Sequence, residues 1–147
     1  MPLDRRTAVA ALAVLGLACT RPVPGILTLA PAGMRLTGTT TPHADGTLAM
    51  SVEATAAAAV YVDAGAVTIT VTAKTAADDQ PVLIAVWLAG TRIGTERVQK
   101  ATAASFAFHG QARSSGPTPL QIRCSADGTA ASPGNALEVQ KVVVTQP

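Results

Sequence analysis

The chain has 147 residues, which is enough for one domain of ordinary size. Hydrophobic residues make up 48% of it, and this excludes an intrinsically disordered chain, because disorder requires low hydrophobicity together with high net charge. The formal charge is only +2 and the basic residues are scattered, which argues against nucleic acid as a partner. Charged residues are rare at 14%, against about 25% in an ordinary soluble domain.

The N-terminal residues have the pattern of an export signal. Two adjacent arginines precede an uncharged apolar run from Thr7 to Leu17, which is too short to span a bilayer but has the length of a signal-peptide core. Small residues at Gly16 and Ala18 fit a cleavage after Ala18. We therefore expect an exported protein with a signal peptide at 1–18, a tether at 19–25 and one domain at 26–147.

The segment Leu15–Cys19 also resembles a bacterial lipobox, in which the cysteine thiol is acylated and becomes the first mature residue. This resemblance implies lipidation at Cys19, a location in the cell envelope, and contact with the membrane only through that lipid anchor. Ordinary cleavage, which would give a secreted or periplasmic protein, is the alternative. In that case a Cys19–Cys124 disulfide is possible, whereas Cys124 otherwise stays a lone, buried thiol.

The rest of the chain alternates apolar and polar residues with the period of a half-buried strand, most clearly over 67–74. The run Val82–Leu88 is apolar at every position, which predicts a central buried strand with Trp87 in the core. Ala54–Ala59 has high helix propensity and predicts a single helical turn. Turn sequences separate the strands, so we predict a single antiparallel β-sandwich, jelly-roll or Ig-like, of about eight or nine strands. The predicted strands are 48–53, 67–74, 82–88, 93–98, 102–108, 120–125 and 137–144.

In an antiparallel sandwich, alternate loops lie at the same end. The loops 75–80, 100–101 and 126–135 should therefore lie together, and they carry four oxygen-bearing side chains. Oxygen ligands gathered on loops are what Ca²⁺ requires, although an aspartate in a turn more commonly bonds its own backbone. The candidate ligand-binding residues are Asp78, Asp79, Asp127 and Asn135.

The opposite end should collect a second set of polar residues from the remaining loops. Two histidines and two carboxylates can bind zinc, but their spacing matches no zinc motif, and ordinary surface loops are the simpler interpretation. The residues of this set are His43, Asp45, Asp63 and His109.

Four segments together resemble the core of small β-sandwich carbohydrate-binding modules of the calcium-dependent xylan-binding type. They are Asp63–Ala73, Pro81–Gly94, Leu120–Asp127 and Asn135–Val139. The resemblance implies a calcium and ligand loop that contains Asp127 and Asn135. It implies an extracellular glycan as the partner and calcium as the cofactor.

Motifs of the common enzyme classes are missing from the sequence, including the nucleophile elbow, the phosphate-binding glycine loop and the zinc-protease helix. We therefore expect a non-catalytic exported binding module. The alternative is a structural or adhesive surface protein that assembles with itself or with a partner protein through edge strands. The apolar C-terminal strand Val142–Thr145 supports this alternative if it lies at a sheet edge.

Overall fold

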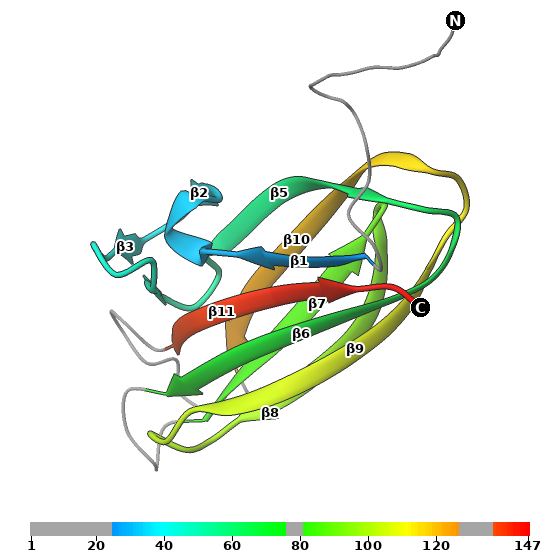
Figure 1. Ribbon diagram of the computed structural model, residues 1–147. Helices are drawn as coiled ribbons and strands as arrows, with labels where there is room; N and C mark the ends of the chain where they lie inside the picture. Colours follow the sequence, from blue (N-terminus) through cyan, green and yellow to red (C-terminus); the bar gives the residue numbers. More distant parts are fainter. Residues whose placement is uncertain (1–24, 76–80, 127–136) are drawn as a thin grey trace, which may run out of the picture.

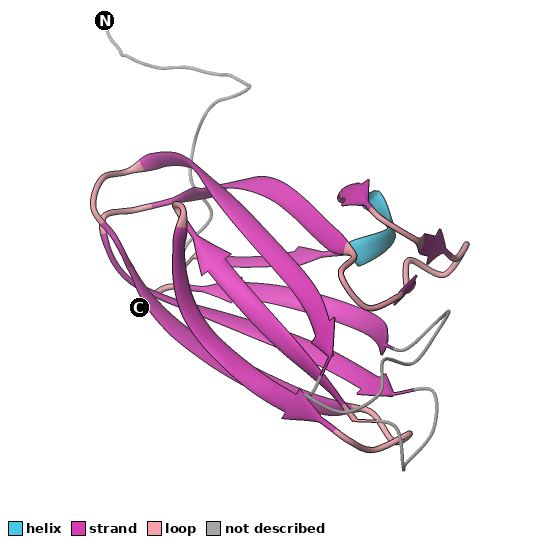
Figure 2. Cartoon of the chain, turned by 180° about the vertical axis from the view of Figure 1, so that it is seen from behind, coloured by secondary structure: helices cyan, strands magenta, loops and turns pink. Residues whose placement is uncertain are grey.

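The computed structural model describes residues 25–75, 81–126 and 137–147, and these form two antiparallel sheets packed face to face (Figure 1). Strands make up most of the described chain, with one short 3₁₀ turn (Figure 2). No helix in these ranges is long and apolar enough to cross a membrane. The elements are β1 (Ile26–Leu29), η1 (Pro31–Gly33), β2 (Arg35–Thr37), β3 (Thr40–Pro42), β4 (Leu48–Met50), β5 (Thr55–Val62), β6 (Gly65–Thr75), β7 (Val82–Leu88), β8 (Thr91–Val98), β9 (Ala104–Ala112), β10 (Gly116–Ala126) and β11 (Leu137–Thr145).

The strand order identifies the sandwich as a jelly roll. One sheet has the order β3-β4-β11-β6-β9, with β1 also paired to β11, and the other has the order β2-β5-β10-β7-β8. From β4 to β11 every connection passes from one sheet to the other, except the β7–β8 hairpin. This is the double-sheet arrangement of a jelly roll, so the structure confirms the predicted antiparallel sandwich and selects one of its two expected forms. The short strands β1, β2 and β3 are additions that the sequence pattern did not reveal.

The core lies between the sheets and is built from alternate residues of the long strands. In β6 the apolar residues are fully buried while the threonines between them are half-exposed, as the alternation predicted. Facing side chains from the two sheets form one continuous cluster. Its larger members are Leu48, Met50, Val60, Val62, Val67, Ile69, Val71, Val82, Ile84, Val86, Leu88, Phe108, Leu120, Ile122, Leu137, Val139, Val142 and Val144.

The alanine-rich segment is a strand, so the predicted helical turn at Ala54–Ala59 is wrong. All of these residues except Ala54 belong to β5, which pairs with β10 over its whole length and with β2 over its first three residues. Ala54 and Ala56 point inward and are buried against the core. Ladder hydrogen bonds and burial of alternate methyl groups outweigh the helix propensity of alanine, which is a difference of less than about 1 kcal/mol per residue.

The C-terminal strand is not an unpaired edge. In β11, Val142–Thr145 pairs with β1 on one side and with β6 on the other. The prediction that this segment is a sheet edge at which a partner could add a strand is therefore wrong. The exposed hydrophobic residues on a strand beside it are Ile26 and Leu27, at 57% and 39% exposure, and they belong to β1.

Gly94 of β8 makes room for a core aromatic ring. A Cβ built at this position would lie 2.8 Å from Cδ2 of Phe108, which is only 2% exposed. We predict that Gly94→Ala lowers the free energy of unfolding by about 1–3 kcal/mol, because the ring must shift within a packed core. Urea denaturation measures this change. Gly33→Ala is the matched control, since a Cβ there meets nothing within 4 Å, and equal stability of the two variants would contradict the packing.

Cys124 is a free thiol buried in the core. Burial, assisted by the negative charge of Glu53, raises the pKa of the Cys124 thiol to about 12. Because the unfolded value is about 8.5, the thiol stabilises the fold below that pH, and this contribution is lost as the pH rises toward about 12.

We therefore predict that Cys124 of a Cys19→Ser chain reacts with a thiol reagent near pH 8 only when the domain unfolds. A colorimetric disulfide reagent, applied with and without urea, measures the two rates. Fast labelling of the native protein would show that the thiol is accessible and would contradict its burial.

Candidate functional site

The predicted ligand-binding residues Asp78, Asp79, Asp127 and Asn135 lie outside the described residues, and so does Cys19. Their roles stay predictions. The strand ends that border their loops are described, however, and these show where the loops begin and end.

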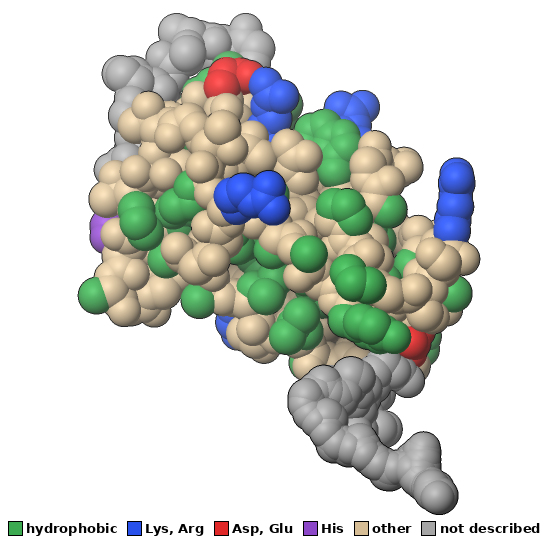
Figure 3. Space-filling view, turned by 90° about the horizontal axis from the view of Figure 1, so that it is seen from above, with side chains coloured by type: hydrophobic (Ala, Val, Ile, Leu, Met, Phe, Trp, Pro, Cys, Tyr) green, Lys and Arg blue, Asp and Glu red, His purple; other side chains and the backbone are tan. Residues whose placement is uncertain are grey.

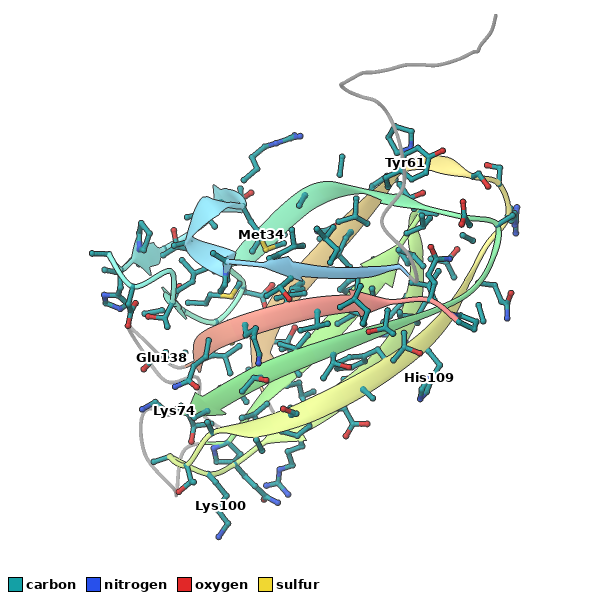
Figure 4. All side chains as sticks on the ribbon, in the orientation of Figure 1. Met34, Tyr61, Lys74, Lys100, His109 and Glu138 are labelled. Carbon is teal, nitrogen blue, oxygen red and sulfur yellow. The ribbon has the colours of Figure 1, made fainter. Side chains whose placement is uncertain are left out.

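These strand ends meet at one end of the sandwich. Thr75, the last residue of β6, pairs with Leu137 at the start of β11, and its N–H donates to the carbonyl of Lys100 over 2.8 Å. On the other sheet Val82 lies between Ala126 and Val98. The predicted grouping of the loops 75–80, 100–101 and 126–135 at one end is thus confirmed for the residues that flank them. Figure 4 shows Lys74, Glu138 and Lys100 near this end, away from Tyr61 and His109.

A hollow of about 180 Å³ opens beside this end, at the side where β8 and β9 face each other. It is smaller than the usual ligand pocket of about 300 Å³ or more, and its lining is mostly apolar. The residues that line it are Ala73, Arg97, Val98, Gln99, Lys100, Thr102, Ala104 and Phe106. Its size and lining do not favour it as a binding site.

The four residues considered for zinc do not come together. Asp45 accepts hydrogen bonds from the backbone N–H and the hydroxyl of Thr47, at 3.1 and 2.7 Å, and these bonds lower the pKa of its carboxyl group. This turn joins β3 to β4 near the start of β11, so the prediction that it shares an end with Asp63 and His109 is wrong. The reason is the shortness of β4, which pairs only with Leu137–Val139, so the turn before it lies beside the first residues of β11. Asp63 and His109 lie at the far end of β11, where Asp63 contacts Gln146 and where Thr68, the partner of His109, pairs with Thr145. The described residues contain no group of three or more His, Cys, Asp or Glu that could hold a metal ion.

Trp87 lies on the outside of the β2-β5-β10-β7-β8 sheet, so its predicted place in the core is wrong. Its neighbours Val86 and Leu88 are fully buried, whereas the Trp87 side chain is half-buried and points the other way. The uniformly apolar sequence of β7 concealed this alternation. The polar residue Gln121, which stands opposite Trp87 on β10, is the signal that this face is open.

Five residues from five strands lie in one line across this outer face, and we call this line the tryptophan row. Directly paired residues in antiparallel strands project to the same side of a sheet, so the register alone defines the row. Trp87 pairs with Gln121 on one side and with Arg92 on the other, and Gln121 pairs with Ala57. The members of the row, in order, are Arg35, Ala57, Gln121, Trp87 and Arg92.

An ion pair lies next to the tryptophan row on the same sheet. Arg123, two residues beyond Gln121 on β10, donates through Nη2 to Oε1 of Glu53. Glu53 has a φ of 72°, an unfavourable value for a residue with a Cβ, and its N–H donates to the Cys124 carbonyl over 2.7 Å. Such strain persists where the surrounding structure enforces it, and it is common at binding sites.

The outer face therefore offers three kinds of contact within a small area. The indole of Trp87 provides a flat apolar surface, Gln121 provides an amide donor and acceptor, and the guanidinium groups provide charged donors. Tyr61 extends the same face at the far end of β5, opposite Pro117, and is 55% exposed. This combination suits a ligand that has both apolar faces and hydroxyl groups.

No protein-family model matches the sequence, and no curated protein matches it. Solved structures do match its fold. The CBM36-1 domain of a multidomain xylanase from the hindgut metagenome of Trinervitermes trinervoides has a TM-score of 0.65 at 12% identity, over 84% of this chain and 98% of that domain.

Two further structures were solved with ligands bound. A CBM36 carbohydrate-binding module in complex with calcium and xylotriose has a TM-score of 0.59 at 11% identity, over 82% of this chain and 97% of that one. The module CBM6cm-2 from Cellvibrio mixtus lichenase 5A, in complex with cellotriose, has a TM-score of 0.61 at 11% identity, with the same coverage. This chain therefore has the β-sandwich fold of the CBM36 and CBM6 carbohydrate-binding modules, as the sequence resemblance implied.

Proposed function

We propose that this protein is an exported, non-catalytic module that binds an extracellular carbohydrate. The observation that carries the proposal is Trp87, half-buried on an outer sheet face in line with Gln121 and Arg92. Its fold is that of modules solved with xylotriose and cellotriose, which supports the same class of ligand here.

The chemistry of the face fits a sugar ring. Pyranose rings have an apolar face of C–H groups, which packs against an indole, and an equatorial belt of hydroxyls, which needs donors and acceptors at its rim. The amide of Gln121 supplies both on one side of Trp87. The Glu53–Arg123 pair adds a carboxylate and a guanidinium group beside the row, because Arg123 is two residues beyond Gln121 on β10.

Binding without catalysis is the better proposal for this face. Glycoside hydrolysis requires two carboxyl groups a few ångströms apart on either side of the scissile bond. Within the part of the chain that the structure describes, the carboxylate beside Trp87 and Gln121 is that of Glu53, and it is already paired with Arg123.

We further propose calcium as a cofactor at the loop end of the sandwich. Asp127 and Asn135 would hold the ion, with Asp78 and Asp79 from the neighbouring loop as further oxygen ligands. Calcium in the complex of the CBM36 neighbour supports this proposal. The ion would offer coordination positions to sugar hydroxyls.

Export and anchoring complete the proposal. The export signal predicted at 1–18 supports a place in the cell envelope or outside the cell, with Cys19 as the lipid attachment. The tether predicted at 19–25 is only a few residues long, so a lipid on Cys19 would hold the domain close to the membrane. Mass spectrometry of the mature N-terminus distinguishes acylated Cys19 from a free or disulfide-bonded thiol.

We predict that Trp87→Ala weakens glycan binding by about tenfold or more, because the stacking surface is lost. Isothermal titration with xylan, cellulose and β-glucan oligosaccharides measures the affinity. His109→Ala is the matched control, since His109 lies on the outer face of the other sheet, where Nδ1 is 3.2 Å from the Thr68 hydroxyl. Equal binding by both variants and the parent chain would refute this face as the site.

We predict that calcium raises the melting temperature relative to EDTA and that Asp127→Ala abolishes this rise. Binding to the folded state alone adds about 2.7 kcal/mol of stability at a hundredfold excess over Kd. Glu96→Gln, which removes an exposed carboxylate from β8, should keep the full calcium effect. An unchanged melting temperature in the parent chain would remove calcium from the proposal while leaving the outer-face site intact.

A further inference from the structure

We infer that the glycan recognised by the tryptophan row is acidic, carrying carboxylate or sulfate groups. The inference rests on the proposed function and narrows its ligand class. It starts from the two arginines that end the row, Arg35 and Arg92.

Neither arginine has an ion-pair partner within the part of the chain that the structure describes. Both are exposed, on the edge strands β2 and β8. By contrast Arg123 is paired with Glu53, and Lys74 lies 3.8 Å from Glu138. The row therefore has an uncompensated positive charge at each end. The view from above in Figure 3 likewise shows more Lys and Arg than Asp and Glu side chains.

The positions of the two charges fit an extended chain that lies across the strands. Arg35 and Arg92 are separated by four strand spacings, which is about 19 Å at about 4.8 Å per spacing. Trp87 is one strand spacing from Arg92, and Gln121 is one further spacing along the row toward Arg35. A polysaccharide stacked on Trp87 and running along the row would pass both guanidinium groups.

Guanidinium groups discriminate strongly between charged and neutral partners. A planar guanidinium binds carboxylate or sulfate with two parallel hydrogen bonds, which are stronger than bonds to a neutral hydroxyl. Among the described residues, the carboxylate beside the row is that of Glu53, and its pairing with Arg123 reduces its repulsion of an acidic ligand. An acidic glycan therefore gains contacts at both ends of the row that a neutral glycan does not.

The test compares charged polymers with their neutral counterparts. The full-length chain is titrated, in EDTA and at low and high salt, with polygalacturonate and its carboxyl-reduced form, and with dextran sulfate and dextran. We expect at least one charged polymer to bind about tenfold tighter than its neutral form and to weaken as salt rises. Preference for polygalacturonate would identify carboxylates as the ligand groups, and preference for dextran sulfate would identify sulfates.

Variants assign the effect to the row. Arg35→Gln and Arg92→Gln should each lower the affinity for the charged polymer by about fivefold, and Arg113→Gln, an exposed arginine of the β9–β10 turn, should leave it unchanged. Thermal melts confirm that all three variants fold. Equal losses in the three variants, or equally tight binding of single-stranded DNA, would overturn the inference, because both indicate unspecific charge attraction.

The outcome also separates this inference from the proposed function. Binding of neutral glycans alone, lost in Trp87→Ala, would overturn the acidic ligand and leave the carbohydrate module standing. Binding of no glycan of either kind would refute both.

Discussion

The two sheets are held together by the apolar side chains that each long strand directs into the space between them. The rest of the molecule depends on this packing. Six of the seven connections from β4 to β11 change sheets, so neighbouring strands in a sheet come from distant parts of the chain. Each strand must therefore present an apolar row to the same narrow space. Even the alanines of β5 obey this requirement, and where space is short a glycine replaces a larger residue, as Gly94 does beside Phe108.

Because inward positions are committed to the core, recognition is left to the outer faces and the loop ends. The outer face of the β2-β5-β10-β7-β8 sheet has Trp87, an amide and several guanidinium groups on rigid strands, which hold side chains more firmly than loops do. The loop end has the oxygen-bearing residues considered for calcium.

The low overall charge of the chain gives the unpaired arginines their significance. In a protein with only 14% charged residues, an exposed arginine that has no ion-pair partner in the described part of the chain is not part of a general ionic surface. Such an arginine remains solvated until a partner supplies an anion. Because one stands at each end of the tryptophan row, the pair favours a negatively charged ligand that lies along the row. Salt affects such contacts more than it affects stacking on Trp87, so the two contributions are separable by experiment.

The sequence by itself determined the fold class and the positions of the long strands other than β5. Period-two alternation in segments such as 67–74 reflects burial of one face, a local pattern that any sandwich must have. It also placed the strand ends that flank the loops 75–80, 100–101 and 126–135 at one end of the sandwich, because strand direction alternates along the chain.

Only the tertiary structure decided the conformation of Ala54–Ala59 and the orientation of Trp87. Alanine has a weak preference that pairing with β10 overrides, and a uniformly apolar strand such as β7 gives no sign of which face meets the other sheet. The tryptophan row was equally invisible, since its five members are joined by strand register and not by sequence distance. Local pattern determines which residues form strands, whereas the pairing of distant strands determines which side chains meet.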